Sequence, residues 1–190
     1  MYIFYFLVVV YFIAVLTTTN GQLTLPWEEI TPTGTNPSAR RSHIAIRYKD
    51  NMYVFGGTDD IGNFFNDVYA FNLITTTWVA VNPSGTIPNG RYAPTAIFYK
   101  DNMVVFGGIA SGNTVNVDVH KLNLITNTWT KVNPSGTNPR NLLHGHTAIS
   151  YNDSMVVFGG LYHDTTWKHT NDLFKLNLIT NTWTKVNPSG

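Results

Sequence analysis

Hydrophobic residues in most of this chain occur in short runs, and turn-forming residues separate the runs. Residues 94–99 read PTAIFY and residues 103–108 read MVVFGG, with KDN between them. Residues 117–124 (VDVHKLNL) and 128–132 (TWTKV) follow, with ITN between them. β-Branched and aromatic residues dominate these runs, and no window keeps a 3.6-residue period, so the pattern predicts four short β-strands.

One of these runs, Met103–Phe106, is apolar at every position. A strand with one face in solvent would instead alternate between apolar and polar residues. The run therefore predicts a strand that is covered on both faces, as in a sheet packed between two neighbouring sheets.

The strand pattern recurs along the chain with a period near 50 residues. Double glycines begin at residues 56, 107 and 159, and tryptophans stand at 27, 78, 129 and 183. The sequence LNLITNTWTKVNPSG occurs identically at 122–136 and 176–190. A fixed period of this length with strand-like content indicates a propeller or another repeat array, in which each unit needs neighbours to cover its faces.

These repeats resemble the kelch motif, which has a double glycine after a hydrophobic strand, an Asn-Asp before the third strand and a Trp in the fourth. The resemblance implies an all-β, kelch-type β-propeller with three complete four-stranded blades, from repeats at about 40–82, 91–133 and 143–187. It assigns structural roles to the motif residues Gly56, Gly57, Trp78, Gly107, Gly108, Trp129, Gly159, Gly160 and Trp183.

The segment LPWEEIT resembles the fourth strand of a further blade, and we expect an orphan outer strand over residues 23–31. Kelch propellers often complete one blade from both ends of the chain. Propellers have about 4–8 blades, so three blades form an incomplete ring with two apolar faces unpaired. We expect either a longer protein, of which this is the front half, or self-association of two copies through the open blade faces.

The first sixteen residues are uncharged and mostly apolar, and a polar segment follows them. This length suits a secretory signal peptide over residues 1–21, cleaved before Gln22, and it predicts a secreted protein with a mature domain over residues 22–190. The alternative is an uncleaved membrane anchor formed by residues 1–16. Asn152-Asp153-Ser154 is an acceptor sequence for N-glycosylation, which makes Asn152 a candidate glycan site.

Composition removes several function classes. Charged residues make up 12% of the chain and the net charge is +1, which gives no basic surface for nucleic acid. The chain has no cysteine, so disulfides, Cys-based zinc sites and thiol nucleophiles are excluded. His144, His146, His163 and His169 could gather near the third repeat and hold a metal, but no carboxylate has a recognisable spacing to them. We predict no metal and no cofactor.

The repeats differ mainly between their second and third strands. These loops read TDDIGNFFN (58–66), IASGNTVN (109–116) and LYHDTTWKHTN (161–171), and they share almost nothing. In an up-and-down blade these loops and the connections between blades emerge on one face. Varied loops on a repeated scaffold are the usual location of binding residues.

We therefore predict a non-catalytic module that binds a protein or a glycan through this face by rigid display of aromatic and charged side chains. The arginines could read an acidic ligand, or could brace adjacent blades. The alternatives are a kelch-fold enzyme, such as an oxidase or isomerase, whose active site needs further blades, and a truncated product without independent function. The ligand-binding candidates are Arg40, Arg41, Asp59, Asp60, Arg91, Tyr92, Arg140, His144, Tyr162, His163, Asp164, Trp167, Lys168 and His169.

Overall fold

The computed structural model describes residues 17–19, 22–24, 28–139, 142–163 and 166–187. The chain divides into two units, Met1–Thr31 and Pro32–Gly190. In the first unit, β1 (Thr17–Thr19) pairs with β2 (Gln22–Thr24) in an antiparallel ladder. Among the described residues, no helix has the length and apolar character needed to cross a bilayer.

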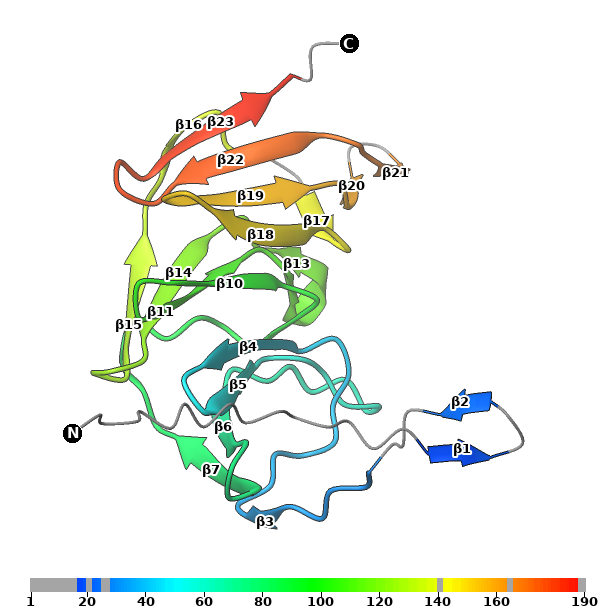
Figure 1. Cartoon of the computed structure of the whole chain (residues 1–190). Helices are drawn as coiled ribbons and strands as arrows, with labels where there is room; N and C mark the ends of the chain where they lie inside the picture. Colours follow the sequence, from blue (N-terminus) through cyan, green and yellow to red (C-terminus); the bar gives the residue numbers. More distant parts are fainter. Residues whose placement is uncertain (1–16, 20–21, 25–27, 140–141, 164–165, 188–190) are drawn as a thin grey trace, which may run out of the picture. The chain divides into compact units, whose positions relative to one another are not determined.

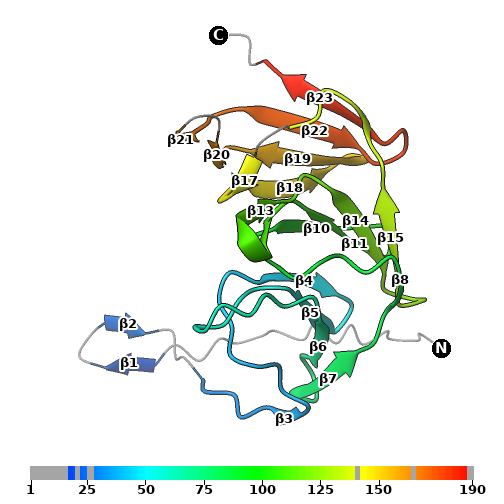
Figure 2. The ribbon, with the colours of Figure 1, turned by 180° about the vertical axis from the view of Figure 1, so that it is seen from behind.

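The second unit is built from three antiparallel four-stranded blades. The blades are β4 (Ile44–Tyr48), β5 (Asn51–Phe55), β6 (Val68–Asn72) and β7 (Thr77–Val81); β10 (Thr95–Tyr99), β11 (Asn102–Phe106), β14 (Val119–Asn123) and β15 (Thr128–Val132); and β18 (Thr147–Tyr151), β19 (Ser154–Phe158), β22 (Leu173–Asn177) and β23 (Thr182–Val186). The first strands β4, β10 and β18 lie beside one another while the fourth strands diverge, so the blades open like a fan (Figures 1 and 2). The predicted all-β, propeller-type architecture is confirmed.

Each blade has a short fifth strand that comes from the segment preceding it. The strands β3 (Thr33–Gly34), β8 (Ser84–Gly85) and β16 (Ser135–Gly136) run parallel to β7, β15 and β23 respectively. The approach is so close that a Cβ on Gly85, which has φ +87°, would lie 2.3 Å from the carbonyl oxygen of Trp129. Glycine is therefore required where one blade's connection crosses the next blade's tryptophan strand.

This fifth strand changes the interpretation of the N-terminal segment. Within the expected outer strand at 23–31, residues 23 and 24 belong to the β1–β2 hairpin, and residues 28–31 lie in no strand. Trp27, on which that expectation rested, lies outside the described residues. The repeat element that does form is Thr33–Gly34, and it completes the first blade.

The hydrophobic core lies between the blades. Met103 and Val105 of β11 face the first blade, whereas Val104 and Phe106 face the third, and all four side chains are buried. At each junction a fourth-strand tryptophan packs on a phenylalanine of the preceding blade. Trp129 lies 5.1 Å from Phe55 and Trp183 lies 5.1 Å from Phe106, between ring centroids. Coverage of both faces of the strand at 103–106 is as predicted.

Polar contacts join the same blades at the end opposite the long loops. The last residue of each first strand, Tyr48 or Tyr99, donates its hydroxyl hydrogen to an aspartate in the first turn of the next blade. The Tyr48 hydroxyl lies 2.8 Å from Asp101 Oδ1, and the Tyr99 hydroxyl lies 2.5 Å from Asp153 Oδ1. Tyr151 is the equivalent residue of the third blade, and its side chain is exposed.

These three tyrosines form a series with an internal control. We expect Tyr48→Phe to lower the free energy of unfolding by about 1–2 kcal/mol, because it removes a hydrogen bond to a carboxylate. Tyr151→Phe should change it by less than about 0.5 kcal/mol, since no such bond is lost. Urea unfolding of both variants in dilute solution measures the difference. An equal loss in the two variants would contradict the assigned role of the Tyr–Asp contact.

Candidate binding face

The long loops and the connections entering each blade are joined by β-pairing at one end of the unit. In the second repeat, β9 (Arg91–Tyr92) pairs with β12 (Ile109–Ala110), which pairs with β13 (Thr114–Val115). In the third, β17 (Leu142–His144), β20 (Leu161–His163) and β21 (Trp167–His169) form the same arrangement. In the first, Thr58 bridges Arg41 and Phe64. We call this end the loop face.

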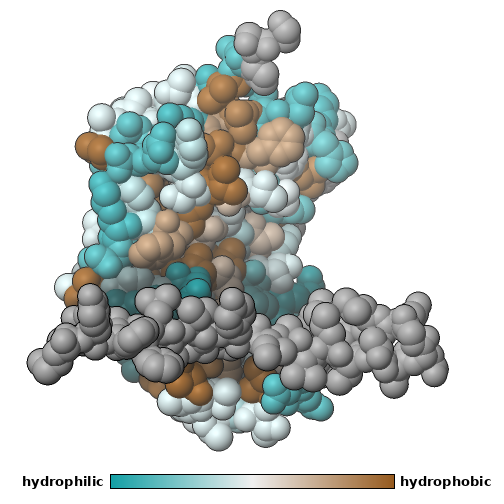
Figure 3. All heavy atoms as spheres, in the orientation of Figure 1, coloured by the Kyte–Doolittle hydropathy of each residue, from teal (hydrophilic) through white to brown (hydrophobic). Residues whose placement is uncertain are grey.

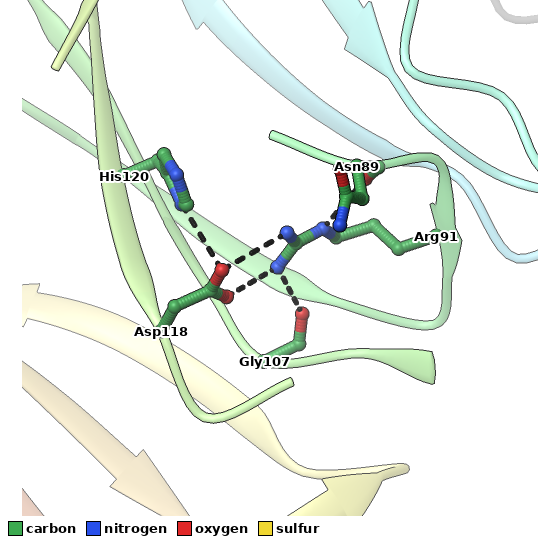
Figure 4. A network of polar contacts seen from close by, with 5 residues as sticks. All are labelled: Asn89, Arg91, Gly107, Asp118 and His120. Carbon is green, nitrogen blue, oxygen red and sulfur yellow. Dashed lines mark hydrogen bonds and ion pairs between the residues drawn. The ribbon is translucent and has the colours of Figure 1, made fainter. Parts of the chain in front are cut away.

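The base of the second loop is held by a buried arginine (Figure 4). Arg91 donates from Nη1 to Asp118 Oδ1 at 2.6 Å and to the carbonyl oxygen of Gly107 at 3.0 Å, and from Nη2 to Asp118 Oδ2 at 3.2 Å. Its Nε donates to the carbonyl oxygen of Asn89 at 3.1 Å. Arg91 has no exposed surface, whereas the Asp118 side chain keeps 22% of its surface in solvent. A fully paired, bidentate contact of this kind fixes both ends of the loop.

The first loop is held in the same way, and we call the pairs Arg40–Asp67 and Arg91–Asp118 the clamps. Arg40 donates to both carboxylate oxygens of Asp67, at 2.5 and 3.0 Å, and to the carbonyl oxygen of Gly56 at 3.1 Å. Its guanidinium lies 4.2 Å from the centre of the Phe65 ring. The interpretation of Arg40 and Arg91 as ligand-reading residues is therefore corrected, because their donors are already engaged inside the protein. They brace the loops instead.

The third loop is anchored differently. Leu142 pairs with Tyr162 as Arg91 pairs with Ala110, so a leucine occupies the place of the arginine. The pairing shifts between Leu142 and His144, which accommodates the extra residue of this repeat. Asp172, the aspartate that precedes the third strand as Asp118 does, is still paired, because its Oδ1 lies 2.7 Å from Lys185 Nζ of β23.

Charge and burial determine the protonation states of Asp118 and of the neighbouring His120. Desolvation raises the pKa of Asp118, but the hydrogen bonds and charge of Arg91 outweigh it and hold the pKa below its ordinary value. Burial lowers the pKa of His120, and the nearby Asp118 only partly opposes this effect. His120 Nδ1 lies 3.6 Å from Asp118 Oδ2, and the neutral imidazole packs edge-on to Trp129. Arg91 is therefore the cation that balances Asp118 at neutral pH.

Above the clamps, three rings form a row across the loop face. The Tyr92 ring lies 5.6 Å from Phe64 of the first loop and 6.1 Å from His144 of the third repeat, between centroids. All three side chains are half-buried. Tyr92 and His144 occupy equivalent positions, each pairing with the residue after a double glycine. We call Phe64, Tyr92 and His144 the aromatic row.

Two depressions lie along the first two loops. One, of about 490 Å³, is lined by Ala39, Arg40, Arg41, Thr58, Asp59, Asp60 and Ile61. The other, of about 390 Å³, lies between the first and second loops, where Phe64 and Gly90 contribute to its wall. Both depressions are lined in part by residues of the first loop, so the loop face has two depressions beside its aromatic side chains.

The remaining predicted residues are dispersed. Arg41 is exposed, with its Nε 3.9 Å from Asp60 Oδ1, and Asp60 is fully exposed. Asp59 instead organises its own loop by accepting hydrogen bonds from Asn63. Desolvation raises the pKa of Asp59, but the hydrogen bonds from Asn63 and from the backbone N–H groups of Ile61 and Gly62 together outweigh it and hold the pKa below its usual value.

In the third loop, Tyr162 is half-buried, whereas Lys168 and His169 are exposed. Only the backbone of His163 and Trp167 is described, in β20 and β21. Asp164 and Arg140 lie outside the described residues. Phe64 was missing from the predicted set, and only its position in a varied loop could have indicated it.

Known proteins share this arrangement of repeats. The KLHDC2/KLHL20/DRC7 Kelch-repeats domain matches residues 13–190. Kelch domain-containing protein 3 of Rattus norvegicus is 31% identical over 178 residues, which cover 86% of this chain and 45% of that protein. Kelch domain-containing protein 10 of Homo sapiens is 29% identical over 166 residues, covering 80% and 37% respectively.

The chain belongs to the kelch-repeat family. It spans less than half the length of these two relatives. Kelch repeats in general form protein-interaction modules, and the three kelch blades here carry the glycine pairs, aspartates and tryptophans that define the motif. Within the described part of the chain, no three His, Asp or Glu side chains are grouped so that they could hold a metal ion.

His146, one of the candidate metal ligands considered from the sequence, lies beneath the loop face and not on it. His146 is buried, with its ring 5.2 Å from that of Phe106 and its Cε1 against Gly107 of the second blade. Burial lowers the pKa of His146 to about 4 from about 6.5. The equivalent His43 of the first blade is exposed.

This burial predicts a pH-dependent stability. As the pH falls from about 6.5 to about 4, the unfolded chain binds a proton at His146 that the folded chain does not, so stability is lost over this range. His146 should contribute about 3 kcal/mol to this loss, and His146→Leu should remove that part, while the smaller contribution of the buried His120 remains. Urea unfolding between pH 7 and pH 4 gives the comparison, with His43→Leu as the control that keeps the wild-type slope. Equal slopes for wild type and His146→Leu would refute the assignment.

Proposed function

We propose that this chain binds a segment of a partner protein across the aromatic row of its loop face. The observation that carries the proposal is the row itself. Phe64, Tyr92 and His144 come from three repeats, the Tyr92 ring lies next to each of the other two, and all three keep part of their surface in solvent. Aromatic rings that are held but not fully buried are the side chains that contribute most to protein interfaces.

The clamps below the row support this proposal. Arg40–Asp67 and Arg91–Asp118 fix the bases of the first two loops. The rings therefore have little freedom to lose when a partner binds, and preorganisation of this kind lowers the entropic cost of association. The mode of action is rigid display, which requires no bond making or breaking.

The charges beside the row indicate what kind of segment fits. Arg41 and Asp60 lie exposed near its first-loop end, and His169 is exposed in the third loop. Charges of both signs around an apolar centre match the polar rim and apolar core of protein interfaces. The partner should contribute one or two apolar side chains to the rings and both acidic and basic groups beside them.

A displayed library of random peptides can test the proposal with this chain as bait. Peptides selected on the wild type should bind Tyr92→Ala at least about tenfold more weakly, since a central aromatic contact contributes about 1.5 kcal/mol or more. Ile125→Ser is the matched control, because Ile125 is an exposed side chain in the turn between β14 and β15, at the other end of the blade. Its affinities should equal those of the wild type.

Circular dichroism of Tyr92→Ala must match the wild type for the comparison to count, and Tyr92→Phe provides a variant with less disturbance of packing. The proposal fails if selected peptides bind all variants equally, or if no peptide binds while a glycan array gives ligands that depend on Tyr92. The latter result would assign the same face to carbohydrate.

A further inference from the structure

The third blade has one apolar face that no other described part of the unit covers. Ile149 is 63% exposed, Tyr151 61% and Phe158 52%. Val156 and Leu173 lie on the same side of the sheet, because they pair across the strands with Ile149 and Phe158 respectively. Figure 3 shows hydrophobic surface over the third blade in the upper half of the view. We call this surface the third-blade face.

The equivalent face of the second blade is buried by the third blade. Ile97 is 4% exposed and Phe106 is fully buried, and both belong to a cluster with Met155, Leu176 and Trp183. Ile149 and Phe158 of the third-blade face thus occupy the positions of the buried Ile97 and Phe106, but no described blade packs on them.

The opposite face of the first blade carries the other half of such a junction. Met52, Leu73 and Trp78 correspond to Met155, Leu178 and Trp183, which the second blade covers. Leu73 is 48% exposed, against 5% for Leu178, and Trp78 is half-buried where Trp183 is fully buried. Asp50 stands at the place of Asp101 and Asp153, and it is exposed. We call this surface the first-blade face.

We propose that the third-blade face binds the first-blade face of a second copy of this chain. In this contact Phe158 packs on Trp78 of the other copy, as Phe106 packs on Trp183 within the chain. The hydroxyl of Tyr151 donates to the Asp50 carboxylate, as that of Tyr48 does to Asp101. Both internal junctions thus supply the pattern, and the two free faces hold its two halves.

A third internal contact supports the same docking. At the junction of the second and third blades, Lys121 Nζ lies 3.4 Å from the carbonyl oxygen of Leu178 and 3.4 Å from Asn181 Oδ1. Lys175 occupies the equivalent place on the third-blade face, and Leu73 provides the equivalent carbonyl oxygen on the first-blade face. Lys175 can therefore reach this carbonyl oxygen across the new junction, whereas Thr76 stands at the position of the second acceptor, Asn181.

The contact joins two different faces, and this determines the symmetry of the assembly. Each copy offers one face of each kind, so two copies that make the contact twice are related by a two-fold axis. Such a pair contains six blades, which lies within the usual size of a propeller ring. A single contact repeated without closure would instead give a chain of growing length.

Site-directed crosslinking can test the contact cleanly, because the chain has no cysteine of its own. Tyr151→Cys and Asp50→Cys are prepared separately and then mixed in the presence of a short bismaleimide. A crosslinked dimer should appear in the mixture and should be at least tenfold weaker with either variant alone. Crosslinking of Tyr151→Cys to itself would overturn the proposal, since it would bring two third-blade faces together.

Light scattering on the full chain gives an independent test. The wild type should change with concentration from 21.3 kDa to twice that mass, and Phe158→Asp should shift the midpoint at least tenfold towards higher concentration. Ile125→Asp, which adds the same charge outside both faces, should leave the midpoint unchanged. If Phe158→Asp loses its β-sheet circular dichroism signal, Tyr151→Phe serves instead, with a smaller shift in the same direction.

Three further results would overturn the proposal. One is a wild type that stays at 21.3 kDa at all concentrations. Another is an association that both aspartate variants leave unchanged, as expected if the apolar N-terminal segment alone drives it. The third is a natural protein whose single chain is much heavier and monomeric, because its own further blades would then cover the third-blade face.

Discussion

The packing of a tryptophan from one blade against a phenylalanine of the blade before it is the interaction on which the rest of this structure depends. A single four-stranded blade has two apolar faces and no interior, so it gains its core only from its neighbours. Trp129 on Phe55 and Trp183 on Phe106 supply that core, and the buried strand β11 lies between them. Because burial between blades provides most of the stabilisation, the surface residues of the loops are free to differ without loss of the fold.

Arginine–aspartate pairs convert this packing into a fixed loop face. Arg40 and Arg91 each connect the strand entering a blade to the residue preceding its third strand. The third repeat achieves a related result with Lys185 and Asp172, although its cation comes from the outer strand. The aromatic row therefore rests on two rigid loops and one that is anchored from outside, and this difference separates the third repeat from the others.

The repeat pattern was sufficient to predict the strands, the blades and the position of the loop face, because these follow from spacing and from the alternation of apolar runs with turns. It could not identify the role of Arg40 or Arg91, since a bidentate pair and a ligand-reading arginine look the same in one sequence. Their partners stand 27 residues away, beyond a loop of unknown path. The element Thr33–Gly34 was also missed, because two residues give no periodic signal, and only the carbonyl oxygen of Trp78 beside Gly34 explains that glycine.

The short parallel strands β3, β8 and β16 have a consequence for how such a chain can change its number of repeats. Each of these strands precedes a blade and pairs with the fourth strand of that blade, through a Thr-Gly or Ser-Gly pair that meets the tryptophan; β8 and β16 come directly from the blade before. The pairing of this short strand with the fourth strand of the following blade is therefore equivalent in all three repeats. A recombination event within this short strand can insert or delete one whole blade and still restore every hydrogen bond at the crossing. Duplication of a whole repeat therefore lengthens the chain without changing the sheets that are already present. Recombination at a point within a blade would instead have to form a new four-stranded sheet from parts of two repeats.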